Sequence, residues 1–149
     1  MTYPIGDPAQ LDDAVSVAKK YFQTYVDKDR SLIEQLIAED FHFSSPLDNR
    51  IDRKTYFARC WPNSDNITAF RLVHITQSDD RVFVTYEGRN QSNQVFRNTE
   101  VLTVRDGRLV EIEVYFGWSV PHSAMPGGFV DKVLHNPEMN AGASPKMKA

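Results

Sequence analysis

The chain has 149 residues, of which 41% are hydrophobic and 25% charged, and its net charge is −3. These values are typical of one ordinary globular domain, and they give no signal for nucleic acid or a membrane as a partner. The single cysteine, Cys60, excludes an internal disulfide framework, and no Cys/His cluster has the spacing of a metal site. Without an apolar stretch of membrane-spanning length or a signal-peptide pattern, the chain is expected to be cytoplasmic.

The N-terminal part of the chain has helical periodicity. Asp7-Pro8 is typical of a helix start, and apolar residues then recur at three- and four-residue steps as far as Val26. Ser31 and Glu34 form a capping-box pattern, which predicts a short second helix that ends near Glu39.

The next segment combines a short strand with a third helix. Residues 41–45 alternate as a strand does, and the proline that follows them indicates a turn over residues 46–49. Asp52 is a suitable N-cap for a helix that runs to about Trp61, where another proline ends it.

A period of two then continues to the end of the globular part. Strands are expected at residues 67–76, 81–89, 94–105 and 108–118. Asp106-Gly107, between the last two, is a strong hairpin signal because both residues accept positive φ angles. Connections this short favour consecutive antiparallel pairing, so the pattern predicts an α+β domain with helices on one face of a curved sheet.

The element order and three sequence segments carry a family resemblance. The segments are Tyr21 in the first helix, residues 36–46 leading into the first strand, and residues 98–117 in the last two strands. Over about residues 11–118 the chain resembles the SnoaL-like, ketosteroid-isomerase-like branch of the nuclear-transport-factor-2-like superfamily. The resemblance implies a cone-shaped, mostly antiparallel sheet that wraps around a long N-terminal helix and two shorter ones and encloses an apolar pocket.

One domain and one tail are expected. After Val120 the composition shifts to Pro, Gly, Met and Asn, with little periodicity. The cone domain is therefore expected at residues 1–120, and an extended or partly disordered tail at residues 121–149.

Strand alternation predicts which side chains face the pocket. If Phe116 points inward, then Val114 and Ile112 point inward with it, and the pocket wall on that strand is apolar. The inward set of the preceding strand includes Asn98 and Glu100. Glu100 is then an acid among apolar neighbours.

The resemblance implies a role for Tyr21 and Glu100. In ketosteroid isomerases a tyrosine on the first helix and an acid on the penultimate strand donate protons to a developing enolate, and these two residues occupy the matching positions. A carboxyl in an apolar cavity stays protonated more readily, so Glu100 is expected to donate a hydrogen bond near neutral pH. The structural alternative is that Tyr21 is core and that Glu100 pairs with Arg71 or Arg89.

Two positions depart from the patterns of the superfamily. Ser45 stands where the isomerases have their catalytic aspartate, and it is a poor general base, so genuine ketosteroid isomerisation is disfavoured. Asn98 stands where the epoxide hydrolases have an arginine, which disfavours that reaction too. Asp48 is expected to be a solvated turn residue.

His74 is a further candidate for acid/base chemistry, because a histidine titrates near physiological pH. If Phe70 and Leu72 face inward, His74 faces inward with them. The opposite face, with Val73 and Ile75, is equally apolar, so the parity of this strand stays open.

The predicted site is therefore a lined pocket. Its catalytic set is Tyr21, Glu100 and His74. The residues expected to bind substrate are Tyr25, Phe43, Tyr56, Trp61, Tyr86, Asn98, Phe116 and Trp118. Whether Phe43 or His42 of the first strand faces inward is left open. No metal or cofactor is expected.

Three classes of function fit this interpretation. The first is a cofactor-free acid/base enzyme of isomerase, cyclase or dehydratase type, acting on a small apolar or cyclic molecule. The second is a protein that binds such a ligand without turnover, and the third is a homodimeric interaction module. By resemblance a homodimer is expected through the outer sheet face, which carries Arg97, Thr99, Val101, Thr103, Glu111, Glu113 and Tyr115.

Overall fold

A computed structural model describes residues 13–131 of the chain. Its helices are α1 (Ala14–Asp27), α2 (Arg30–Leu36), α3 (Arg53–Arg59) and the 3₁₀ helix η1 (Trp61–Asn66). Its strands are β1 (Ile37–Ser45), β2 (Asp48–Asp52), β3 (Ile67–Ser78), β4 (Arg81–Asn90), β5 (Val95–Arg105) and β6 (Arg108–Val120). The expected helix start at Asp7 lies outside the described residues.

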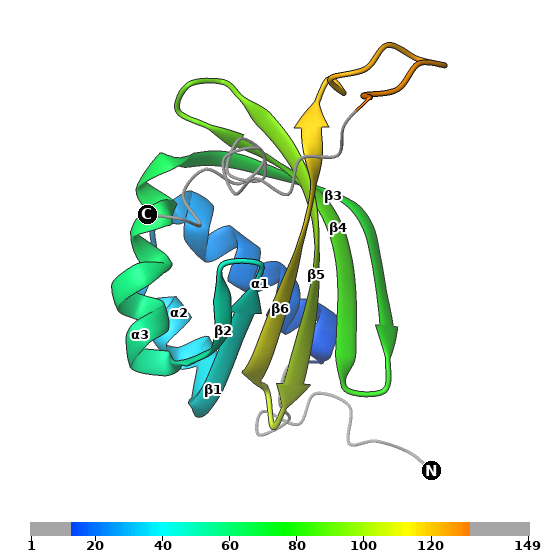
Figure 1. The fold of residues 1–149 in the computed structure, drawn as a ribbon. Coiled ribbons are helices and arrows are strands. Elements are labelled where there is room, and N and C mark those ends of the chain that lie inside the picture. Colours follow the sequence, from blue (N-terminus) through cyan, green and yellow to red (C-terminus); the bar gives the residue numbers. More distant parts are fainter. Residues whose placement is uncertain (1–12, 132–149) are drawn as a thin grey trace.

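The strands form one curved sheet that remains open and does not close into a barrel (Figure 1). Their order is β2-β1-β6-β5-β4-β3, and β1 runs parallel to β6 while the other neighbours are antiparallel. In Figure 1 α1 lies behind the sheet, and α2 and α3 lie at one side of it. The predicted α+β class and the curved sheet around an N-terminal helix are thus confirmed.

Helix α1 covers the inner face of the sheet because its apolar residues share one stripe. It contacts β3, β4 and β5. The buried members of the stripe are Ala14, Val17, Ala18, Tyr21, Phe22 and Tyr25. Asp13 caps the helix by accepting the N–H of Ser16 at 2.7 Å, and Lys28 ends it in a left-handed conformation.

The start of α2 differs from the expected one. Its N-cap is Asp29, which accepts the N–H of Leu32 at 3.0 Å, and not Ser31. Glu34, the expected second member of a capping box, forms an i,i+4 ion pair with Arg30. Aspartate and serine are comparably good caps, so local sequence alone does not choose between adjacent candidates.

The first strand is longer than expected, and a second short strand follows it. β1 begins at Ile37, and the segment interpreted as a turn leads directly into β2. The expected cap of α3 is confirmed, because Asp52 accepts the N–H of Thr55 at 2.9 Å.

The later elements follow the sequence pattern closely. Asp106 and Gly107 join β5 to β6 with φ angles of 53° and 76°, as the hairpin signal predicts. Residues 121–131 contain no helix or strand, and the rest of the expected tail lies outside the described residues. Within residues 13–131 no helix is both long and apolar enough to cross a membrane.

Candidate functional site

Glu100 projects from β5 into the apolar interior. It stands opposite Val84 of β4 and Val114 of β6, both of them buried, and it is itself only 6% exposed. Burial disfavours the ionised carboxylate and raises the pKa of Glu100 to about 7, although a hydrogen bond from Tyr86 acts in the opposite direction. Near neutral pH the side chain therefore populates both its protonated and its ionised form.

Tyr86 holds one of the two carboxyl oxygens. The Tyr86 hydroxyl donates to Glu100 Oε2 at 2.6 Å, and Asn98 Nδ2 lies 3.4 Å from the same hydroxyl. Glu100 Oε1 is buried and has no hydrogen-bond partner within the described part of the chain. A buried polar atom in this state is a natural recognition point for a ligand oxygen.

Three tyrosines of α1 and α3 have hydroxyl groups within hydrogen-bond distance of one another. The Tyr56 hydroxyl of α3 lies 2.9 Å from the Tyr21 hydroxyl and 2.5 Å from the Tyr25 hydroxyl, both of α1. Burial raises the pKa of all three, so they are neutral hydroxyls at physiological pH. The charge of Glu100 also raises the pKa of Tyr21 and Tyr25. The Tyr21 ring packs against Phe22, which packs against Tyr86, the partner of Glu100.

Aromatic rings surround these hydroxyls. The ring centroids of Phe22 and Tyr86 are 4.9 Å apart, and those of Tyr25 and Trp61 are also 4.9 Å apart. Phe43 is buried against Tyr56, which resolves the parity of β1. Further rings of the inner side are Phe41, Phe70, Phe96 and Phe116. The hydroxyls and the carboxyl are therefore enclosed by aromatic side chains.

His74 does not join this cluster. Leu72 pairs with Tyr86, but His74 pairs with Thr85, so Val73 is the extra residue of a bulge. The bulge reverses the alternation, and His74 is exposed on the outer face. The premise that His74 faces inward together with Leu72 is thus corrected.

Trp118 is displaced in the same way. Phe116 pairs with Asn98 and Trp118 with Arg97, which leaves Gly117 as a bulge residue in β6. A Cβ atom at Gly117 would lie 2.1 Å from the Arg97 carbonyl oxygen, so this close approach requires glycine. Trp118 turns to the outer face and is 51% exposed, which corrects its expected place in the pocket.

Asp48 is not a solvated turn residue. Its side chain is 1% exposed, and it forms an ion pair with Arg59 of α3. The Ser45 hydroxyl donates to the other carboxylate oxygen at 2.7 Å. Asp48 therefore ties the β1–β2 corner to α3, and Ser45 is engaged in that contact.

The family of the chain follows from a comparison with protein-family models. The model of the SnoaL-like domain matches residues 18–112, which begin within α1 and end within β6. This chain belongs to the SnoaL-like family. A search of curated proteins finds no match.

Solved structures share the fold of this SnoaL-like protein at low sequence identity. A candidate ketosteroid isomerase from Kribbella flavida has a TM-score of 0.62 and 16% identity, over 81% of this chain and 90% of that one. An LEH-like epoxide hydrolase from M. tuberculosis has a TM-score of 0.61 and 15% identity, over 70% and 82%. IdmH, a candidate polyketide cyclase from Streptomyces antibioticus, has a TM-score of 0.58 and 19% identity, over 69% and 91%. At these identities the likeness shows the fold alone.

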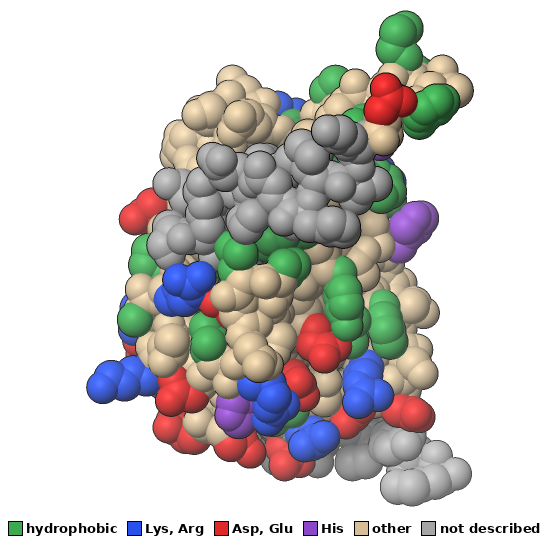
Figure 2. Space-filling view, in the orientation of Figure 1, with side chains coloured by type: hydrophobic (Ala, Val, Ile, Leu, Met, Phe, Trp, Pro, Cys, Tyr) green, Lys and Arg blue, Asp and Glu red, His purple; other side chains and the backbone are tan. Residues whose placement is uncertain are grey.

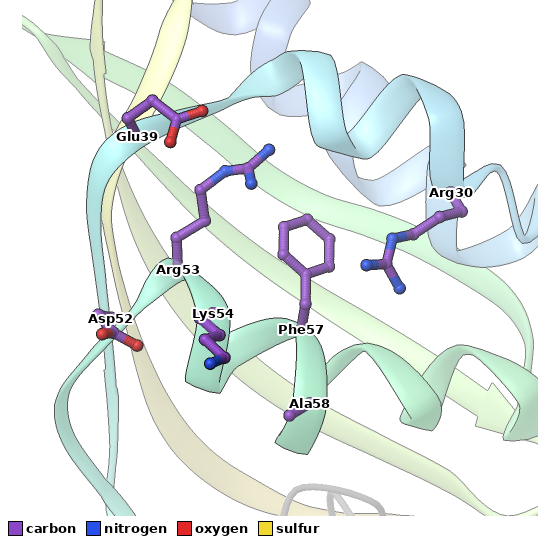
Figure 3. Close-up of a pocket in the computed structure, with 7 residues that line it drawn as sticks. All are labelled: Arg30, Glu39, Asp52, Arg53, Lys54, Phe57 and Ala58. Carbon is purple, nitrogen blue, oxygen red and sulfur yellow. The ribbon is translucent and has the colours of Figure 1, made fainter.

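The SnoaL-like domain also has a surface groove of about 620 Å³ beside α2 and α3 (Figure 3). The Phe57 ring lies between the guanidinium groups of Arg30 and Arg53, at 4.3 and 5.1 Å from its centroid. Arg30 pairs with Glu34, and Arg53 donates to the backbone carbonyls of Glu34 and Ile37. The contacts of Phe57 and Arg53 join α2 to α3, so the two arginines of the groove already have structural partners.

The structure thus brings together most of the polar residues that the sequence singled out. Those that meet on the inner side are Tyr21, Tyr25, Tyr56, Tyr86, Asn98 and Glu100. Their functional roles stay predictions. The residue that sequence reasoning overlooked is Gly117, although a glycine inside a strand is a recognised signal for a bulge.

Proposed function

We propose that this SnoaL-like protein binds a small apolar or cyclic organic molecule at the inner face of its sheet and that Glu100 recognises an oxygen of that molecule. The observation that carries the proposal is the buried, partnerless Oε1 of a carboxyl whose pKa is raised to about 7. A protonated carboxyl in an apolar site is a strong donor to a carbonyl oxygen or an oxyanion.

The surroundings of Glu100 support a ligand of this chemistry. The rings of Phe22, Tyr25 and Tyr86 offer apolar contact area, while the tyrosine hydroxyls offer polar anchors. Solved structures of the same fold include a candidate polyketide cyclase and a candidate ketosteroid isomerase, both named for cyclic molecules.

Turnover requires a proton acceptor in addition to a donor. Ser45 stands at the position of the family's base, and its hydroxyl is engaged with Asp48 and with the N–H of Leu47. Ionised Glu100 is itself a base, since a group with a pKa of about 7 exchanges protons in either direction at neutral pH. A cofactor-free acid/base reaction centred on Glu100 is therefore the enzymatic form of the proposal, and ligand binding alone is its non-catalytic form.

The test compares two ligands that differ by one oxygen, 1-indanone and indane. Wild-type protein should bind the ketone about three- to tenfold better than the hydrocarbon at about pH 5.5, where Glu100 is protonated, and should lose much of this preference at about pH 8.5. Glu100→Ala should lose the preference at both pH values. Ligand-observed NMR titration measures both affinities.

The control is Thr99→Val, because Thr99 neighbours Glu100 on β5 but bonds Thr85 on the outer face. This variant should keep the wild-type preference. Equal binding of the two ligands by wild type, or a preference that survives in Glu100→Ala, would remove Glu100 from the site.

We also infer a homodimer through the outer sheet face. A hollow of about 240 Å³ on this face is lined by apolar side chains and by side chains of both charges. Phe83, Val101 and Tyr115 line it together with Arg81, Glu111 and Glu113. Figure 2, which views the side of the sheet opposite α1, shows hydrophobic side chains in its middle and charged ones gathered below. A patch that carries both charges can pair with itself about a two-fold axis.

Light scattering after size exclusion tests this assembly. Wild type should have twice the 17.1 kDa chain mass, and Tyr115→Glu should have the mass of one chain. Lys19→Glu, on the exposed face of α1, is the matched control and should stay dimeric. A wild-type monomer would refute the dimer, and the cytoplasmic location remains a separate prediction.

A further inference from the structure

We propose that Asn98 is a positioning residue that, together with the Gly117 bulge, directs the single hydroxyl proton of Tyr86 onto Oε2 of Glu100, so that Glu100 carries its own exchangeable proton on Oε1. The inference deepens the proposed function, on which it rests, by naming the atom that donates to a ligand. It follows from the direction of three successive hydrogen bonds.

The first bond fixes the orientation of the Asn98 amide. Gly117 N–H can only donate, and it lies 3.1 Å from Asn98 Oδ1. The oxygen of the amide must therefore face β6, and the NH₂ group must face the other way. The bulge makes this possible, because Gly117 sits against the Arg97 carbonyl where a Cβ atom would not fit.

The second bond fixes the Tyr86 hydroxyl. Asn98 Nδ2 lies 3.4 Å from the Tyr86 hydroxyl oxygen, a long contact in which the amide is the donor. With a donor already facing its oxygen, the hydroxyl turns its own proton toward an acceptor. The acceptor within reach is Glu100 Oε2, at 2.6 Å.

The third bond fixes the proton of Glu100. If Glu100 were protonated on Oε2, that proton and the proton of Tyr86 would both point into the same 2.6 Å contact. The proton is therefore carried on Oε1, which is buried and has no hydrogen-bond partner within residues 13–131. Oε1 is thus a donor when Glu100 is protonated and an acceptor when it is ionised, while Oε2 keeps one bond in both states.

The other titratable groups near Glu100 do not compete for this proton at neutral pH. They are Tyr21 and Tyr25 of α1, Cys60 at the end of α3, and Tyr86 of β4. Burial raises the pKa of each of them, and the charge of Glu100 raises it further. All four stay protonated while Glu100 titrates.

Infrared spectroscopy of ligand-free protein tests the assignment. Below about pH 6 the carboxylic C=O band of Glu100 is isolated as the difference between wild type and Glu100→Gln. In the proposed arrangement Oε2 is the carbonyl oxygen and accepts from Tyr86, which lowers the stretching frequency. Tyr86→Phe should therefore shift the band upward, and Asn98→Leu should do the same because the Tyr86 hydroxyl becomes free to turn away.

A carbon NMR titration of the Glu100 carboxyl gives a second readout. Tyr86→Phe should raise the midpoint by about one pH unit, the effect of losing a hydrogen bond to a charged group. Asn98→Leu should raise it in the same direction, and the double variant should not exceed Tyr86→Phe alone, because Asn98 acts through Tyr86. Asn98→Ala also removes the donor to Tyr86 without adding a charge beside Glu100, so it replaces Asn98→Leu if that variant does not fold.

Thr99→Val is again the matched control and should leave band and midpoint unchanged. A C=O band that does not respond to Tyr86→Phe would place the proton on Oε2 and overturn the inference. An unchanged band and midpoint in the Asn98 variants, or additive shifts in the double variant, would remove Asn98 from its positioning role. Since no ligand is present, these outcomes are independent of 1-indanone binding, which alone decides the proposed function.

Discussion

Tyr86 and Glu100 occupy diagonal positions on β4 and β5, where the tyrosine hydroxyl lies 2.6 Å from the carboxyl oxygen Oε2. Both side chains point to the inner face because Tyr86 pairs with Asn98, two residues before Glu100. Within the sheet the acid is therefore held by a neutral partner, and neither Arg71 nor Arg89 pairs with it. Arg71 pairs with Glu87 on the outer face.

Stability should depend on pH through Glu100. Its pKa rises from 4.5 in the unfolded chain to about 7 in the folded one, so the folded state binds the proton more tightly. The contribution of this group is therefore favourable below pH 4.5 and is lost as pH rises through about 7. Between about pH 5 and about pH 8, wild type should lose about 2 to 3 kcal/mol of unfolding free energy relative to Glu100→Gln.

Urea unfolding at the two pH values measures this difference. Using Glu100→Gln as the reference cancels the other titrating groups, because the amide does not ionise. A wild-type-minus-variant difference that is the same at both pH values would mean that Glu100 is not buried as a largely neutral acid.

Replacing Gly117 by alanine should destabilise the protein by about 1 to 3 kcal/mol, the usual range for an overpacked site. The new Cβ atom would meet the Arg97 carbonyl at 2.1 Å, and neither backbone can withdraw without opening the β5–β6 ladder. Because Gly117 N–H also orients Asn98, the variant should shift the Glu100 titration as well.

Gly127→Ala is the comparison for this variant. Gly127 has a φ of 84°, and a Cβ there would have no atom of residues 13–131 within 4 Å, so its substitution should cost about 1 kcal/mol or less through backbone strain. Thermal unfolding of the two variants side by side measures the contrast. Equal effects would show that the close approach at Gly117 relaxes freely.

Removing Arg59 should have a larger effect than removing an arginine from a surface ion pair. Arg59→Ala would leave the Asp48 carboxylate, 1% exposed, with Ser45 as its remaining partner. An uncompensated buried charge of this kind costs about 3 kcal/mol, reduced here because Arg59 is 35% exposed.

Arg105→Ala is the matched surface variant, since Arg105 pairs with Asp80 where both side chains are exposed. Arg105→Ala should lower the free energy of unfolding by less than about 1 kcal/mol. Urea unfolding of the two arginine variants measures both losses. If the two arginine variants lose the same free energy, the Asp48–Arg59 pair does not hold the β1–β2 corner to α3.

Local patterns predicted the three α-helices and five of the six described strands in their order, but not β2. They also predicted the Asp52 cap and the Asp106-Gly107 hairpin, because caps and tight turns depend on a few neighbouring residues. The same local reasoning misplaced His74 and Trp118. In each case strict alternation was extended across a strand that contains an extra residue. A bulge is set by pairing with the neighbouring strand, and that partner is remote in sequence.

Asp48 shows the same limit in a polar setting. An aspartate beside a proline turn is typically solvated. Asp48 is instead paired with Arg59 of α3, eleven residues later in the chain. A cation beside a buried carboxylate offsets part of the cost of its burial, and tertiary packing brings Arg59 to Asp48.

Helical periodicity and strand alternation placed Tyr21 and Tyr25 on the apolar stripe of the first helix and Glu100 on one strand face with Asn98. They could not determine which polar groups touch. That Tyr86 holds Oε2, that Asn98 faces Tyr86 and that Tyr56 links two tyrosines of α1 follow from contacts among separate elements. Such contacts depend on the curvature and bulges of the whole sheet, which no short stretch of sequence encodes.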